Sequence, residues 1–269
     1  MENTKFGVEF EFLIPDGYTF EEFTGALKYV GSFDKLRFSS EYSDDDYCDN
    51  KYCDNKTSWF IHCDFSIGGK TAGMEISSPI LSGQKGLKEV ANLLKILNKF
   101  KCTVNKTCGL HVHVNTEKLN EVEKLSILAR YSKLENEIDM FVAPHRRKNK
   151  SQFASKIKFS YIEDILFNEL PYSDDLCTDK YLKVSIHDCY PTVEFRQHEG
   201  SLDEKKVLNW IQFCVNFRNQ TVKQFKALNR KNDTCEDVID NYNELDKHKS
   251  VYGLKPSQVR YLNKVRRAA

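Results

Sequence analysis

Three observations predict an α+β fold for this chain of 269 residues. Several short segments alternate between apolar and polar side chains, which is typical of strands with one buried face. Residues 84–100 instead repeat apolar side chains at helical spacing, so they are expected to form an amphipathic helix against the core. The elements follow one another as strands, helix, strand, helices, strands and helix, an order that favours one domain with antiparallel strand pairs.

The composition indicates a folded cytoplasmic protein. Lysine and arginine (40) nearly balance aspartate and glutamate (39), so the net charge of +1 gives no electrostatic attraction to nucleic acid or to membranes. The chain shows no export signal and no membrane-spanning segment. Its nine cysteines have no regular spacing, and we expect them to be reduced thiols.

The first predicted strand covers residues 6–12. Its Phe and Val side chains would face the core, while Glu9 and Glu11 would share the opposite face, about 7 Å apart at the Cα level. Two carboxylates at this spacing repel each other unless a cation or a basic group lies between them. The pattern makes this pair a candidate for cation binding, with an ordinary half-exposed strand as the alternative.

A helix over residues 20–30 follows, and Thr19 and Glu22 can form its capping box. Residues 39–56 are polar and acidic and repeat the sequence Tyr-Cys-Asp-Asn-Lys in tandem. The cysteines of this repeat could be half of a zinc site, but no second pair with suitable spacing follows. We therefore expect a solvated loop insertion here, and then a strand over residues 59–66 that ends in a polar corner.

Two more predicted strands carry polar side chains opposite an apolar row. In the strand over residues 73–80, Glu75 lies opposite Met and Ile; in the strand over residues 108–114, His111 and His113 lie opposite Leu and Val. One such histidine is usually a structural hydrogen-bonding group. Two in alternation favour contact with a metal or a phosphate.

A long helix is predicted from residue 117 to about residue 141, followed by a basic run over residues 144–150. Arg146 and Arg147 in this run could hold phosphate, because a guanidinium binds phosphate through two hydrogen bonds. A solvated loop at the end of a helix is the alternative, and the residues alone favour it. Residues 151–169 are expected to be helical in part.

The last predicted strands form a hairpin over residues 181–186 and 192–200, and the second strand lines up Glu194, Arg196 and His198 on its polar face. Helices are expected after the hairpin, over residues 203–229 and 255–267. The second of these helices is basic but lacks interleaved aromatic residues, so a solvated end is expected rather than a nucleic-acid-binding arm. We expect a catalytic domain over residues 1–230 and a helical extension over 231–269.

Four predicted strands thus bring carboxylates, imidazoles and a guanidinium to the faces opposite the core. Several carboxylates cannot all be ionised in one partly dry basin without cations. Oxygen ligands with one or two imidazoles suit Mg²⁺ or Mn²⁺, and the absence of thiolates argues against structural zinc. Two such cations beside arginines suit a nucleoside triphosphate and phosphoryl transfer.

Four sequence blocks, in order from about residue 5 to residue 215, resemble the amidoligase family, which belongs to the carboxylate–amine ligase superfamily of glutamine synthetase and glutamate–cysteine ligase. The blocks are Phe-Gly-Val-Glu-Phe-Glu, then Asp64-x-Ser66 with Gly-Met-Glu-Ile-Ser-Ser-Pro, then Cys-Gly-Leu-His-Val-His-Val, and last Thr-Val-Glu-Phe-Arg-x-His-Glu-Gly-Ser-Leu-Asp. Lys180 and Ser185 stand where the family's pattern leads us to expect Arg and Asn. This departure leaves the amino-acid pocket undefined and does not affect the expected metal ligands.

The resemblance implies a curved antiparallel sheet, as in the glutamine synthetase catalytic domain, with helices on its convex face and with ATP and two divalent metals on its concave face. By analogy, one metal would be held by Glu9, His111 and Glu194, and the other by Glu11 and Glu75. Arg196 would neutralise the transferring phosphoryl group. The other residues expected at the nucleotide are His111, His113, Arg146, Arg147 and His198.

The implied activity is an ATP-dependent ligase that joins the carboxylate of an amino acid, peptide or protein to an amine through an acyl phosphate. A metal-dependent hydrolase or nuclease that activates water with the same residues is an alternative. A protein that only binds nucleotide is another. A thiol enzyme built on Cys108 is the weakest alternative, because no residue pattern around this cysteine indicates an activated thiolate.

Overall fold

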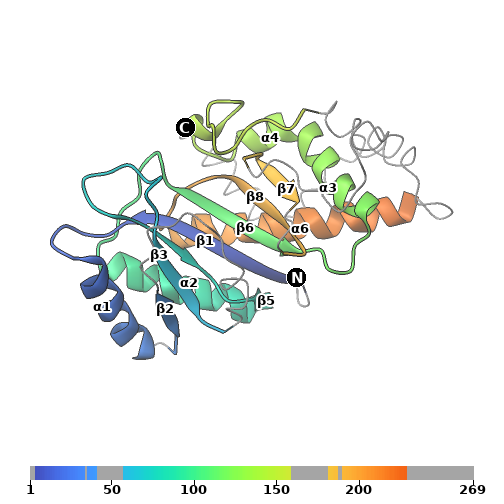
Figure 1. Ribbon diagram of the computed structural model, residues 1–269. Coiled ribbons are helices and arrows are strands. Elements are labelled where there is room, and N and C mark those ends of the chain that lie inside the picture. The colour runs from blue at the N-terminus through green and yellow to red at the C-terminus, as the bar shows by residue number, and fades with distance from the viewer. Residues whose placement is uncertain (1–3, 34, 41–56, 159–180, 187–189, 229–269) are drawn as a thin grey trace. The chain divides into compact units, whose positions relative to one another are not determined.

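The computed structural model describes residues 4–33, 35–40, 57–158, 181–186 and 190–228. Within these ranges the fold is mixed α/β, with a mostly antiparallel sheet and five helices, so the expected combination of helices with antiparallel strands is confirmed (Figure 1). The chain divides into two compact units, Met1–Val112 with Glu199–Ile211 and His113–His198 with Gln212–Ala269. The predicted extension over residues 231–269 lies outside the described residues.

The sheet of the first unit is built around β1 (Lys5–Leu13), which pairs antiparallel with β4 (Gly73–Ser77). Strand β4 pairs antiparallel with β3 (Trp59–Cys63), and the short β5 (Leu81–Ser82) pairs with β1. Strand β2 (Phe38–Ser40) runs parallel to β3. The predicted loop over residues 39–56 is therefore wrong at its start, because residues 39–40 belong to β2; the remainder of that loop lies outside the described residues.

Burial along β1 follows the predicted alternation as far as Phe10, and Glu11 is buried as well. Phe10 and Phe12 are buried, and Phe12 packs against Phe23 of α1 (Phe20–Phe33), with ring centroids 6.0 Å apart. The helix α2 (Gly83–Lys99) contributes an apolar stripe of Leu, Val and Ile to the same core. Two helices thus cover the apolar face of this sheet, and the opposite face is left for the polar side chains.

Helix α1 starts as the sequence predicts. The Thr19 N–H donates to the Glu22 carboxylate at 2.9 Å, and the Glu22 N–H donates to the Thr19 hydroxyl at 3.2 Å. This reciprocal pair satisfies two backbone donors that would otherwise lack partners at the helix start. The expected capping box is confirmed.

The second unit contains the predicted hairpin. Strand β7 (Val184–Ile186) pairs antiparallel with β8 (Thr192–Glu199), with Ser185 opposite Glu194. Strand β6 (Gly109–Asn115) begins in the first unit and ends in the second. All of its residues except Asn115 are buried, so the alternation expected for this strand does not appear in its burial.

The predicted helix over residues 117–141 is two helices, α3 (Glu121–Lys133) and α4 (Glu135–Asp139). The helical run breaks at Leu134, whose ψ of 9° lies outside the helical region. A capping box starts α3, and the short η2 (Pro144–Arg146) follows α4.

The long helix α6 (Glu204–Leu228) confirms the prediction over residues 203–229. The partial helix expected over residues 151–169 is absent from its described part, 151–158. The helix expected over 255–267 lies outside the described residues. In the described part of the chain, no helix combines the length and the apolar character needed to cross a membrane.

Candidate functional site

The polar face of the first unit is organised by strand register. Glu75 on β4 lies directly opposite Glu11 on β1 and, on its other side, opposite His62 on β3. Glu9 lies opposite Ser77 in the neighbouring row. Residues opposite each other on one face of an antiparallel pair have their Cβ atoms about 5 Å apart, so the register itself gathers these side chains.

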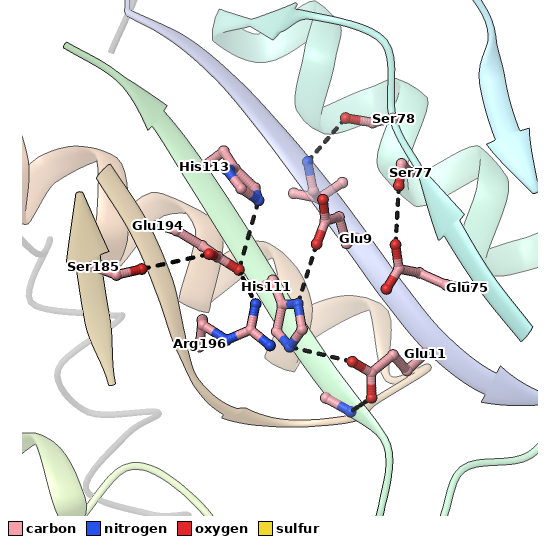
Figure 2. A network of polar contacts seen from close by, with 12 residues as sticks. Glu9, Glu11, Glu75, Ser77, Ser78, His111, His113, Ser185, Glu194 and Arg196 are labelled. Atoms are coloured by element: carbon pink, nitrogen blue, oxygen red, sulfur yellow. Dashed lines mark hydrogen bonds and ion pairs between the residues drawn. The ribbon is translucent and has the colours of Figure 1, made fainter. Parts of the chain in front are cut away.

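His111 on β6 joins the two glutamates of β1. Its Nδ1 lies 3.1 Å from Glu9 Oε2, and its Nε2 lies 3.3 Å from Glu11 Oε1 (Figure 2). A neutral imidazole carries a single N–H and can donate to only one of these carboxylates. The second contact therefore needs either a protonated ring or a cation between ring and carboxylate, and the geometry suits both.

Backbone and hydroxyl donors hold the carboxylates in place. The Gly109 N–H donates to Glu11 Oε2 at 2.6 Å, and the Ser77 hydroxyl donates to Glu75 Oε1 at 3.3 Å. His62 Nε2 lies 3.8 Å from the same Glu75 oxygen. Burial lowers the pKa of His62, against the opposing effect of the Glu9 and Asp64 charges.

Two groups of side chains in the first unit have the composition of a cation site. One is Glu9, Glu75 and His111, and the other is Glu11, Asp64 and Glu75. In each group, one ligand atom per residue lies within 4.8 Å of the others. Carboxylate oxygens with an imidazole are the ligands of hard divalent cations. Glu75 belongs to both groups, so its two oxygens could serve two cations.

Sequence reasoning did not assign a role to Asp64 or His62. Alternation along β3 could have found His62, because Trp59 and Ile61 are buried in the core and His62 therefore faces the other way. Asp64 lies just past the strand and accepts a hydrogen bond from the Ser66 N–H at 2.8 Å. Only the fold brings it near Glu11 and Glu75.

In the second unit, Glu194 is the centre of a polar group. Its Oε1 lies 2.5 Å from Arg196 Nη1 and 3.7 Å from His113 Nε2 (Figure 2). The Ser185 hydroxyl donates to its other oxygen at 3.5 Å, and His113 Nδ1 lies 3.2 Å from the Thr192 hydroxyl. Glu194 is 1% exposed, so these partners replace the water that a buried carboxylate lacks.

The structure thus brings Glu9, Glu11, Glu75 and His111 together in the first unit. It brings His113, Glu194 and Arg196 together in the second. A metal shared by Glu194 with the first-unit ligands stays a prediction.

The remaining predicted residues differ in accessibility. His198 and Arg146 are buried, at 1% and 2% exposed, whereas Arg147 is half-buried and its Nε donates to the Val142 carbonyl at 3.0 Å. Arg146 has little contact with solvent, whereas Arg147 is partly open to it. Arg147 is therefore the more accessible of the two arginines to a ligand from solvent.

Three of the four cysteines that the structure describes, Cys102, Cys108 and Cys214, are buried and do not offer a nucleophile. Cys108 is fully buried, burial raises the pKa of Cys102 to about 12, and burial also raises the pKa of Cys214. A thiol nucleophile needs a lowered pKa and access to substrate. These observations argue against the alternative of a thiol enzyme built on Cys108.

One family model, described as "Putative amidoligase enzyme", matches residues 2–218 of the chain. The matched span includes the residues that come together in the first unit, Glu9, Glu11, Glu75 and His111. It also includes those of the second unit, His113, Glu194 and Arg196. A search of curated proteins finds no match.

Proposed function

Because the chain belongs to the amidoligase family, we propose that it is an ATP-dependent ligase that joins a carboxylate to an amine. A carboxylate and an ammonium ion do not condense readily in water, because the carboxylate has no good leaving group. In the proposed reaction a carboxylate oxygen attacks the γ-phosphorus of ATP, and ADP leaves. The amine, having lost a proton, then attacks the acyl carbon of the resulting acyl phosphate, and inorganic phosphate leaves.

This proposal rests on Glu75, which belongs to both groups of candidate cation ligands. One cation would be held by Glu9, Glu75 and His111, and a second by Glu11, Asp64 and Glu75. Mg²⁺ or Mn²⁺ fits these donors, and when bound it would neutralise charge on the phosphates. A hydrolase could use the same ligands, and the family match favours the ligase.

The chain's own residues would supply orientation and charge. Arg196 would face the transferring phosphoryl group, with its Nη1 held by Glu194 at 2.5 Å so that the guanidinium loses little freedom on binding. His113 would lie beside the phosphates, as the family resemblance implies. The mostly antiparallel sheet supports the further proposal of a catalytic sheet like that of glutamine synthetase.

The test is ADP and phosphate release from ATP with Mg²⁺ or Mn²⁺, across pools of amino acids, amines and peptides. The Glu11→Gln variant keeps the shape of the side chain but removes its charge, and should abolish acceptor-dependent ADP release. Glu21→Gln makes the same change on an exposed face of α1 and should leave it unchanged. Turnover retained in Glu11→Gln would contradict the metal assignment, and product formed without ATP would favour a hydrolase.

A further inference from the structure

Arg147 is fixed through the backbone on both of its sides. The Arg146 carbonyl accepts a hydrogen bond from Gln197 Nε2 at 3.4 Å, and the Lys148 N–H donates to Asp139 Oδ2 at 2.6 Å. Lys148 has a φ of 56°, a left-handed conformation that a lysine seldom adopts without support. The polypeptide around Arg147 is therefore held in one particular conformation.

Asp139 and Gln197, the two side chains that bind the backbone beside Arg147, are buried and make further hydrogen bonds of their own. Asp139 Oδ1 accepts from Lys183 Nζ at 2.7 Å and from Gln197 Nε2 at 2.5 Å. Lys183 also forms an ion pair with Glu135 at 2.5 Å, and the Tyr131 hydroxyl donates to Gln197 Oε1. We call Tyr131, Glu135, Asp139, Lys183 and Gln197 the buried network.

The Arg147 side chain is oriented as well. Its Nε donates to the Val142 carbonyl at 3.0 Å, which fixes the plane of the guanidinium. Its two terminal amino groups make no hydrogen bond or ion pair with any residue in the part of the chain that the structure describes. A guanidinium with Nε engaged and both terminal groups available presents the pair of donors that holds phosphate.

A buried network of this kind is not the simplest route to stability. Apolar residues of similar volume often replace a buried ion pair without loss, because the charges must be taken out of water. Here Asp139 and Gln197 direct their remaining hydrogen bonds to the two peptide groups beside Arg147. Apolar side chains could not make these bonds.

We propose that Arg147 is a pre-organised phosphate-binding residue and that Asp139 and Gln197 are positioning residues that hold it in place. This inference rests on the proposed function, since the phosphate is that of the nucleoside triphosphate. It also separates the two arginines of the pair: Arg146 supplies a backbone carbonyl to the anchor, and Arg147 supplies the donors.

The experiment is calorimetric titration of the full chain with Mg²⁺ and a non-hydrolysable β,γ-imido analogue of ATP. Arg147→Gln should weaken binding about 10- to 100-fold, as expected for loss of charged hydrogen bonds. Asp139→Leu should weaken it about 2- to 12-fold, because the arginine must then be ordered on binding. Asp139→Asn keeps only one of the two acceptor oxygens, which can accept either from the Lys148 N–H or from Lys183 and Gln197, so its binding should fall between that of the unmodified protein and that of Asp139→Leu.

A double-mutant cycle distinguishes positioning from general support of the fold. If Asp139 acts through Arg147, then Asp139→Leu should have little further effect on affinity in the Arg147→Gln background. Lys183 keeps Glu135 as a partner in Asp139→Leu, so the variant is expected to fold, and circular dichroism checks this. Glu137→Ala on the exposed side of α4 is the matched control.

An unchanged nucleotide affinity in Arg147→Gln would overturn the inference and leave the proposed function standing. Fully additive effects of Asp139→Leu and Arg147→Gln would overturn the positioning role. If Arg147→Gln changed the binding of a dicarboxylate but not that of the nucleotide, the guanidinium would be assigned to the donor substrate instead. If the unmodified protein binds no nucleotide, the proposed function fails together with the inference.

Discussion

Replacing Lys183 by Met is expected to lower the free energy of unfolding by about 3–5 kcal/mol at pH 8, the usual cost of breaking a buried ion pair. The lysine is fully buried, and its two partners Glu135 and Asp139 are buried as well. Methionine retains most of the apolar stem, so little of the cost comes from a cavity. The loss would be a large share of the about 5–15 kcal/mol that stabilises an ordinary domain.

The cost should depend on pH in a direction that the structure determines. Burial raises the pKa of Glu135, and Lys183 opposes this effect. Without the ammonium group, the folded-state pKa of this carboxyl should rise further above its unfolded value. The folded variant then binds a proton more tightly than the unfolded chain does, so its stability increases as the pH falls through the folded-state pKa. The deficit should be smaller at pH 5.5 than at pH 8.

Urea unfolding followed by circular dichroism at the two pH values measures both effects. Lys88→Met, an exposed substitution on α2, is the control for the change of residue type. Adding Glu135→Gln and Asp139→Asn to Lys183→Met removes the unpaired charges and should restore much of the stability. A deficit below about 1 kcal/mol at pH 8, or one that is equal at both pH values, would refute the argument.

Further predictions concern the first unit. Calorimetry with Mn²⁺ should show cation binding weakened at both sites by Glu75→Gln but at one site by Glu9→Gln; equal effects would argue against a shared ligand. Gly200→Ala would bring a Cβ atom to 2.4 Å from the Cβ of Cys108, and a loss of about 1–3 kcal/mol is expected from overpacking, measurable as a lower melting temperature. Iodoacetamide at pH 8 should leave Cys102 unmodified in the folded protein, because its pKa is raised to about 12, and should alkylate it in urea. Mass spectrometry measures the labelling, and alkylation of Cys102 in the folded protein would contradict the prediction.

Alternation of side chains predicted much of this structure from the sequence. It identified the strands that carry Glu9, Glu75 and His111 and the faces on which they lie, because a strand with one buried face has a period of two. It did not predict register, which depends on long-range pairing. The placement of Asp64 beside Glu11 could therefore not be seen.

The buried network shows a second limit of sequence reasoning. Lys183 falls within a predicted strand, but its partners Glu135 and Asp139 both come from helix α4, 48 and 44 residues earlier in the chain. No local pattern marks a lysine that will be fully buried. The break at Leu134 was missed for a similar reason, since the apolar repeat continues across it and tertiary packing decides where the helix ends.

The strand register that gathers Glu11, Glu75 and His62 also ties ligand binding to folding. A shift of β4 by one residue would turn Glu75 into the core and Met74 or Ile76 out of it, so no slipped sheet can keep the cluster. Neither an unfolded chain nor an isolated hairpin contains either of the two candidate cation-binding groups of the first unit in complete form. Any cation that binds the cluster therefore stabilises the native register alone, and a rise in melting temperature with cation concentration would measure its affinity before any substrate is known.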